Sequence, residues 1–354
     1  MGGTDLKGMT LEELEELAVG LGEPRYRGSQ LASWLFEKDV RSFDEMTNLP
    51  AALRHQLADG HSICGSRVVE RQRSRKDATE KLLLEFADGT RVEAVVLDDG
   101  GRRTGCISTQ AGCRFGCVFC ATGAMGLIRS LSAAEIVEEV QALNRAIAPE
   151  RLDNLVFMGM GEPLDNYDAV LRAVRILNAP WGLRVGARRM TISTVGLIDG
   201  IRRLAEEGLQ INLAISLNAP TQELRESLMP VAAANPLPKL VDALREYCER
   251  SGRMVTLEYV LLDGVNDSQD DARALASLAE GLPCKINLIC YNQIEDRVFA
   301  PPGNEKTRRF LSQLRKTRPT VVRRQSRGDD ISAGCGQLCV ESRETNTSDE
   351  QTTE

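Results

Sequence analysis

Three cysteines stand close together in the stretch Cys113-Arg114-Phe115-Gly116-Cys117-Val118-Phe119-Cys120. A cubane iron-sulfur cluster is ordinarily held by four Cys thiolates, one on each iron. A local set of three therefore predicts a cluster with one iron left free for a ligand that reacts. Taken alone, this spacing leaves two alternatives open, a zinc site and three unrelated buried thiols.

The Cys-x3-Cys-x2-Cys spacing resembles that of the radical S-adenosylmethionine (SAM) enzymes. In those enzymes the free iron binds the amino and carboxylate groups of SAM, and an electron from the cluster cleaves the sulfonium to a 5′-deoxyadenosyl radical. The resemblance implies a [4Fe-4S] cluster on Cys113, Cys117 and Cys120. It also implies SAM as the second cofactor.

The composition predicts a soluble globular protein. The 354 residues are 42% hydrophobic and 27% charged, which is enough for a full core. No apolar run is long enough to cross a bilayer, and residues 1–16 lack the pattern of a secretory signal. We therefore expect a cytoplasmic protein without a membrane partner, whose cysteines are ligands, catalytic thiols or buried residues rather than disulfides. Inert thiols are expected at Cys64, Cys248, Cys284 and Cys290.

The distribution of charge leaves a nucleic-acid partner open. The net charge of -7 argues against one, because phosphate contacts need Lys or Arg. Basic residues nevertheless gather in three clusters: Arg71, Arg73, Arg75 and Lys76; Arg184, Arg188 and Arg189; and Arg315, Lys316, Arg318, Arg323, Arg324 and Arg327. Taken alone, each cluster is more often a solvated face.

The pattern of apolar residues divides the chain into four parts. Residues 1–65 predict a small domain of short amphipathic helices, with Thr10 to Glu13 as an N-capping box. Residues 66–98 alternate as strands do, with a hairpin turn at Asp88-Gly89. Residues 99–340 alternate strands with helices. Residues 341–354 are polar, and we expect them to be disordered.

The third part predicts an α/β fold. Its strand candidates are 155–158, 189–194, 209–217, 254–262 and 285–290, and its helix candidates include 133–148 and 237–250. Strands that alternate with helices of this length form a parallel sheet with the helices outside.

Small polar residues follow the predicted strands. The block Gly159-Met160-Gly161-Glu162-Pro163 directly follows 155–158. Its glycines allow a ligand to approach the backbone, and Glu162 offers a carboxylate to an amino group. Ser193, Ser216, Asn218 and Asn292 hold similar positions. Active sites of parallel α/β folds lie at these strand ends, so together the residues predict a site for a polar cofactor. Each alone could serve only to hydrogen-bond a strand end.

Further motifs narrow the resemblance. They are Cys106 with Ser108-x-Gln110-x-Gly112-Cys113, the Gly-Met-Gly-Glu-Pro block, residues 282–288, and Arg327-Gly328-Asp329-Asp330 before Cys335. Together they resemble the RlmN/Cfr family of RNA methyltransferases over about residues 10–340. The resemblance implies a partial (β/α)6 radical SAM barrel of six parallel strands with outer helices. Residues 1–65 would be the helical accessory domain, 66–98 a β-hairpin linker region, and 99–340 the barrel with a C-terminal catalytic loop.

The resemblance also implies roles for individual residues. Cys335 would carry the methyl group in transit, Cys106 would close a disulfide with it, and Glu93 would accept a proton. The SAM-binding residues would be Gly161, Glu162, Ser193, Ser216, Leu217, Asn218 and Asn292. The family commonly has His at position 218, so Asn218 puts an acid-base role there in doubt. Cys339 is a bystander or a competitor for the disulfide.

Adenine explains why radical chemistry is needed. Its C2 and C8 are not nucleophiles, so direct methyl transfer from SAM is not available to them. By resemblance, one SAM methylates Cys335 and a second provides the radical that activates this methyl group, which makes two SAM per turnover.

We predict a monomeric enzyme that methylates C2 of an adenosine in 23S rRNA and in tRNA. Its electron donor would be of the flavodoxin or ferredoxin type. One alternative is Cfr-like methylation at C8. Another is a non-catalytic iron-sulfur protein that binds RNA or transfers electrons, which would have no use for a carrier thiol at Cys335.

Overall fold

The computed structural model describes residues 4–294, 297–316 and 320–340, and one sheet dominates them. Its strands are β3 (Arg67–Arg73), β4 (Glu80–Glu85), β5 (Arg91–Asp99), β6 (Arg102–Cys106), β9 (Asn154–Phe157), β10 (Met190–Thr194), β11 (Asn212–Ser216), β12 (Val255–Leu261), β13 (Cys284–Cys290) and β14 (Thr320–Arg324). They lie in the order β14-β13-β12-β11-β10-β9-β6-β5-β4-β3. The strands β6 and β9 to β14 are all parallel.

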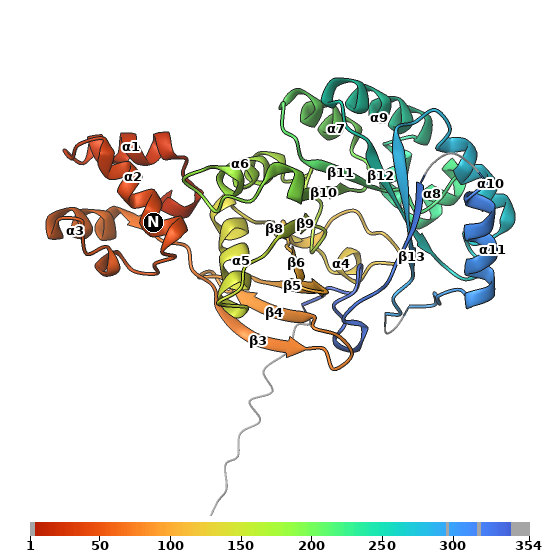
Figure 1. The fold of residues 1–354 in the computed structure, drawn as a ribbon, viewed down its shortest axis with the longest axis horizontal. Helices are drawn as coiled ribbons and strands as arrows, with labels where there is room; N and C mark the ends of the chain where they lie inside the picture. The colour runs from red at the N-terminus through yellow and green to blue at the C-terminus, as the bar shows by residue number, and fades with distance from the viewer. Residues whose placement is uncertain (1–3, 295–296, 317–319, 341–354) are drawn as a thin grey trace, which may run out of the picture.

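Helices connect the parallel strands. They include α6 (Tyr167–Asn178), α7 (Ile198–Glu206), α8 (Gln222–Leu228), α9 (Leu237–Ser251), α10 (Gln269–Leu278) and α11 (Asn304–Leu314). Figure 1 shows the sheet curving around the centre of the molecule, with α7, α9, α10 and α11 on its outer side. The prediction of a parallel sheet with outer helices is confirmed.

The parallel part of the sheet has one strand more than the six expected, because β14 adds to β13. We expected residues 320–324 only as part of a basic cluster. This strand was not predicted, because two arginines follow its short apolar run and a charged pair is typical of a surface segment. Arg324 instead turns out to be half-buried. Arg318, from the same expected cluster, lies outside the described residues.

The predicted hairpin is present and extends the large sheet. β4 and β5 pair antiparallel, with Glu85 opposite Arg91, and Gly89 between them has a φ of 81°. Such a positive φ favours glycine, which explains the Asp88-Gly89 turn. β3 pairs with β4, and β5 pairs with β6. Residues of the hairpin are thereby brought beside the parallel strands.

The link from β6 to β9 contains four elements: β7 (Gln110–Cys113), α4 (Ala121–Ala124), β8 (Gly126–Ser130) and α5 (Ala133–Ala146). β7 and β8 pair antiparallel as a separate sheet. The cysteine motif therefore begins at the end of a short strand and finishes at the start of a short helix.

The short helix η1 (Leu6–Gly8) packs on α5 and precedes the N-terminal helices. These helices are α1 (Leu11–Gly20), α2 (Tyr26–Ala32) and α3 (Ala51–Gly60), and the capping box at Thr10 and Glu13 is present. Lys7 and Glu138 of α5 form an ion pair at 2.6 Å, and both side chains are fully buried. Because Lys7 lies in η1, this pair joins the N-terminal segment to α5.

No helix in the described ranges is long and apolar enough to span a membrane. The predicted tail, residues 341–354, lies outside the described residues.

Candidate active site

The three motif cysteines line one cavity of about 160 Å³. Cys113 is the last residue of β7, and Cys120 is the N-cap of α4. The loop between them is held by the backbone N–H of Val118, which donates to the Leu228 carbonyl at 3.1 Å. Behind it, the N–H of Ala121 donates to the Gly336 carbonyl at 2.8 Å. The C-terminal loop, residues 325–340, is therefore part of the cavity wall.

The thiols fit an iron-sulfur cluster. Burial raises the pKa of Cys113 to about 11, and burial together with the neighbouring Cys120 and Cys113 raises the pKa of Cys117. Buried thiols this close to one another need a cation to become thiolates, and iron supplies that charge. In the part of the chain that the structure describes, no three His, Cys, Asp or Glu side chains converge on a single metal ion. A cubane does not require such convergence, because it takes each thiolate on a different iron.

The Gly159 to Pro163 block presents a fixed carboxylate to the same cavity. Glu162 is 2% exposed and accepts hydrogen bonds from the N–H groups of Leu164 at 3.0 Å and Val195 at 2.8 Å. Burial raises its pKa to about 7. Gly161 has a φ of 96°, and a Cβ there would lie 2.5 Å from the Cβ of Gln110. Glycine is therefore required for the loop to approach β7 this closely.

The predicted strand-end residues lie in two different cavities, and Asn292 lines the second one described below. Ser193, Ser216 and Asn218 line the cavity of the three cysteines, together with Gly161 and Glu162. The side chain of Leu217 is buried, and Leu217 is not among the described residues that line this cavity. Its N–H donates to the Glu258 carbonyl at 3.0 Å.

Asn218 has a left-handed backbone with a φ of 58°. Asn and His both tolerate this conformation better than most residues. Its Oδ1 accepts a hydrogen bond from the Val260 N–H at 3.0 Å, so the side chain is held by the neighbouring strand.

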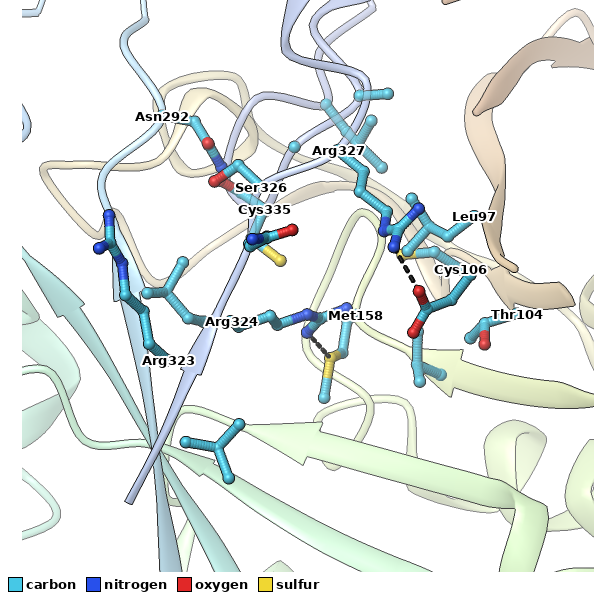
Figure 2. A pocket seen from close by; sticks show the side chains of 18 residues that line it. Leu97, Thr104, Cys106, Met158, Asn292, Arg323, Arg324, Ser326, Arg327 and Cys335 are labelled. Carbon is cyan, nitrogen blue, oxygen red and sulfur yellow. Dashed lines mark hydrogen bonds and ion pairs between the residues drawn. The ribbon is translucent and has the colours of Figure 1, made fainter. Parts of the chain in front are cut away.

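A second cavity of about 410 Å³ contains the predicted carrier thiol, Cys335, and its predicted disulfide partner, Cys106. Cys106, the last residue of β6, and Cys335 line it together, as Figure 2 shows. Asn292 is also here, and its Nδ2 donates to the Cys335 carbonyl at 3.3 Å. The two cavities adjoin, because both are lined by Met158, Ile289, Arg324, Cys335 and Leu338. Cys335 therefore stands between the cluster motif and Cys106.

Arg324 places a positive charge beside these sulfurs. Its Nη1 lies 3.9 Å from the Met158 sulfur (Figure 2), and no carboxylate in the described ranges forms an ion pair with it. Burial raises the pKa of Cys106 to about 12, the nearby Cys335 adds to this rise, and Arg324 opposes it. The guanidinium thus favours the thiolate form of Cys106.

Glu93 lies in a third cavity, of about 910 Å³, with Lys81, Arg297 and Cys339. It is 6% exposed, and it forms an ion pair with Lys81 and accepts a hydrogen bond from the Cys339 N–H. The C-terminal loop separates this cavity from the second. The cavity of Glu93 is lined by the loop residues Ser332, Gln337 and Cys339. The cavity of Cys106 is lined by the loop residues Ala333, Gly334, Cys335 and Leu338.

Sequence reasoning missed three charged residues of these cavities, Lys81, Glu258 and Arg324. Each lies in a strand, and of the three Glu258 alone has an apolar residue on both sides. A single charge inside a predicted buried strand is the signal that could have found Glu258, because such a charge is seldom tolerated without a role or a partner.

Known protein families match both the barrel and the N-terminal helical domain. The sequence model of the Radical SAM superfamily matches residues 107–276, and that of the ribosomal RNA large subunit methyltransferase N-terminal domain matches residues 4–63. A protein of Symbiobacterium thermophilum, named a probable dual-specificity RNA methyltransferase RlmN, is 46% identical over 343 residues, which are 96% of this chain and 92% of that protein. The chain belongs to the RlmN family of radical SAM RNA methyltransferases.

Other RlmN relatives agree with this assignment. The protein of the same name from Geobacillus kaustophilus is 46% identical over 341 residues, 96% of this chain and 93% of its own. The crystal structure of a radical SAM methyltransferase from Sphaerobacter thermophilus has a TM-score of 0.91 and 44% identity, and covers 95% of this chain and 99% of that one. The predicted family and the radical SAM fold are confirmed. Membership in the superfamily implies the [4Fe-4S] cluster and SAM.

Proposed function

We propose that this RlmN-family chain methylates C2 of an adenosine in 23S rRNA and in tRNA, with Cys335 as the methyl carrier. The observation that carries the proposal is the place of Cys335, which lines both the cavity of the cluster motif and that of Cys106. A carrier thiol must be close to the cofactor, where its methyl group is received and activated. It must also be close to a second thiol, which releases the product from it. The names of the relatives, dual-specificity RNA methyltransferases, support two classes of RNA substrate.

Cys113, Cys117 and Cys120 would hold the cluster, and Glu162 would bind the amino group of SAM. When bound, the cluster and SAM supply a 5′-deoxyadenosyl radical that removes a hydrogen atom from the methyl group on Cys335. Asn292 holds the Cys335 backbone, and Arg324 holds a positive charge beside the carrier. A first SAM supplies the methyl group, so each turnover takes two.

Release of the product needs Cys106. Once the thiomethylene carbon has joined adenine C2, the ring would lose its proton to Glu93 and its electron to the cluster, which SAM cleavage has left oxidised. The Cys106 thiolate then attacks the Cys335 sulfur. The S–S bond forms, the bond between carbon and sulfur breaks, and the carbon takes a proton to become the methyl group. Arg324 lowers the free energy of the attacking thiolate.

Glu93 is proposed to accept the proton from the adenine ring. The C-terminal loop carries both Cys335 and the Cys339 N–H that binds Glu93. Because Cys335 and Glu93 line different cavities, a base that contacts both residues requires this loop to move. An electron donor of the flavodoxin or ferredoxin type, a monomeric state and a cytoplasmic location complete the proposal.

Replacement of the carrier tests the proposal. A Cys335→Ala variant should keep its cluster and still cleave SAM, yet form no methylated adenosine. Cys64→Ala, which removes a half-buried thiol outside these cavities, is the matched control and should methylate normally. Methylation by Cys335→Ala at the wild-type rate would refute the carrier role.

A further inference from the structure

Glu258 lies in β12 with its carboxylate in the cavity of the three cysteines. It is 6% exposed. One oxygen, Oε1, accepts a hydrogen bond from Nδ2 of Asn287 at 3.0 Å. The other, Oε2, is enclosed and has no hydrogen-bond partner in the described part of the chain. No Lys or Arg nitrogen of the described residues pairs with this carboxylate.

The register of the sheet puts Glu258 beside a predicted cofactor residue. Ser216 of β11 is opposite Glu258, and Glu258 is opposite Asn287 of β13. The three side chains therefore form one polar row across adjacent parallel strands. Ser216 and Glu258 both line the cavity, at the level where the resemblance implies SAM binding.

A purely structural role does not account for Oε2. A buried carboxylate oxygen without a donor loses its hydration and receives nothing in return, and native proteins rarely leave such a group unsatisfied. Asn287 satisfies only one of the two oxygens. Burial raises the pKa of Glu258, and the nearby Arg324 guanidinium opposes this rise. In its ionised form the carboxylate can only accept hydrogen bonds. A donor on a bound molecule is the missing partner.

We propose that Glu258 is a further SAM-binding residue, whose free oxygen Oε2 accepts a hydrogen bond from a ribose hydroxyl of SAM. The inference rests on the proposed function, which puts SAM in this cavity. A ribose hydroxyl is also present on the target adenosine of RNA. SAM is the favoured source of the hydroxyl, because the three cysteines that would hold the cluster line the same cavity as Glu162 and Glu258.

The test compares SAM with its 2′-deoxy and 3′-deoxy analogues. Equilibrium dialysis against the anaerobically reconstituted protein measures the affinity for each compound, without any turnover. A hydrogen bond to a charged acceptor is worth about tenfold or more in affinity. The wild type should therefore bind one of the analogues about tenfold more weakly than SAM. Glu258→Gln should bind SAM more weakly and lose this discrimination, because an amide nitrogen replaces the acceptor.

Glu280→Gln is the matched control, since Glu280 is exposed and outside the cavity. It should discriminate between SAM and the analogues as the wild type does. If Glu258→Gln fails to fold or to hold its cluster, Glu258→Asp keeps the charge but withdraws it by one methylene. That variant should retain the cluster and bind SAM more weakly.

Several results would overturn the inference. One is equal discrimination by the wild type and Glu258→Gln; another is a wild type that binds both deoxy analogues as tightly as SAM. A third is a Glu258→Gln variant that binds SAM as the wild type does, but no longer discriminates against RNA whose target nucleotide lacks a ribose hydroxyl. That result would assign the contact to RNA. A wild type that holds its cluster but does not bind SAM would instead refute the proposed function.

Discussion

Glu93 and Lys81 form a buried ion pair on adjacent strands, with 2.8 Å between Oε1 and Nζ. Both side chains are less than a tenth exposed. Burial raises the pKa of Glu93, and Lys81 and the Cys339 N–H oppose this rise. Lys81 therefore favours the ionised form of the proposed proton acceptor, which is the form that can take a proton.

Loss of Lys81 should shift the pH dependence of methylation. In Lys81→Met, burial acts on Glu93 without its cation, so the pKa of Glu93 rises and the carboxylate stays protonated to higher pH. The acidic limb of the methylation rate should move to higher pH, and the rate at neutral pH should fall. A pH profile at saturating SAM and RNA measures this. Lys239→Met, at an exposed position, should leave the limb in place, and an unmoved limb in Lys81→Met would contradict the role given to Glu93.

Loss of Cys106 should stop the reaction after the base has been attached. Cys106→Ala has no thiol to attack the Cys335 sulfur, so RNA should remain covalently bound to the protein. A denaturing gel should show a slower band that ribonuclease removes. Cys339→Ala, the matched control, should turn over normally if Cys339 is a bystander. A Cys106→Ala protein that releases methylated RNA as fast as the wild type would rule out the disulfide step.

The cluster ligands can be tested without RNA. Cys117→Ala should lose the brown iron-sulfur absorbance and the reductive cleavage of SAM. Cys284→Ala removes a buried thiol away from the motif, and should keep both. Full iron content in Cys117→Ala, measured after anaerobic reconstitution, would show that the three-cysteine assignment is wrong.

The Lys7–Glu138 pair should matter for stability more than surface pairs do. Breaking a buried pair leaves an unpaired charge, so Lys7→Met should lower the free energy of unfolding by about 3 kcal/mol or more. The surface pair of Arg202 and Glu246 is the control, and its loss should have little effect. Urea unfolding measures both, and equal effects would contradict this account.

The same pair predicts a pH dependence of stability. Burial alone would raise the pKa of Glu138, but Lys7 and Arg145 lower it below the ordinary value of 4.5. Its contribution is therefore fully present above about pH 4.5 and is lost as the pH falls further. The Lys7→Met variant should lose less stability than the wild type over this acidic range.

Local signals made much of the fold predictable. The Asp88-Gly89 turn, the capping box at Thr10 and the strand before Gly159 each follow from a few neighbouring residues, and all are present. β14 was missed because its pairing with β13 comes from tertiary structure, while its own sequence ends in two arginines. Local propensity cannot reveal a strand whose partner decides it.

The site was predictable as a set of residues but not as an arrangement. Motif spacing identified Cys113, the position after a predicted strand identified Glu162, and the family resemblance identified Cys335. None of these signals could show that Cys335 borders two cavities, or that the C-terminal loop separates Glu93 from it. Those relations join residues more than two hundred positions apart, as the hydrogen bond between Cys339 and Glu93 illustrates with a separation of 246.

The identity of the methylated nucleoside is the most direct test of the proposed function. The reconstituted protein would be given methyl-deuterated SAM, a reductant and unmodified ribosomal RNA, and the digested nucleosides analysed by mass spectrometry. We predict labelled 2-methyladenosine. Labelled 8-methyladenosine would assign the Cfr-type reaction instead, and SAM cleavage without any labelled adenosine in ribosomal or transfer RNA would contradict the proposed substrate.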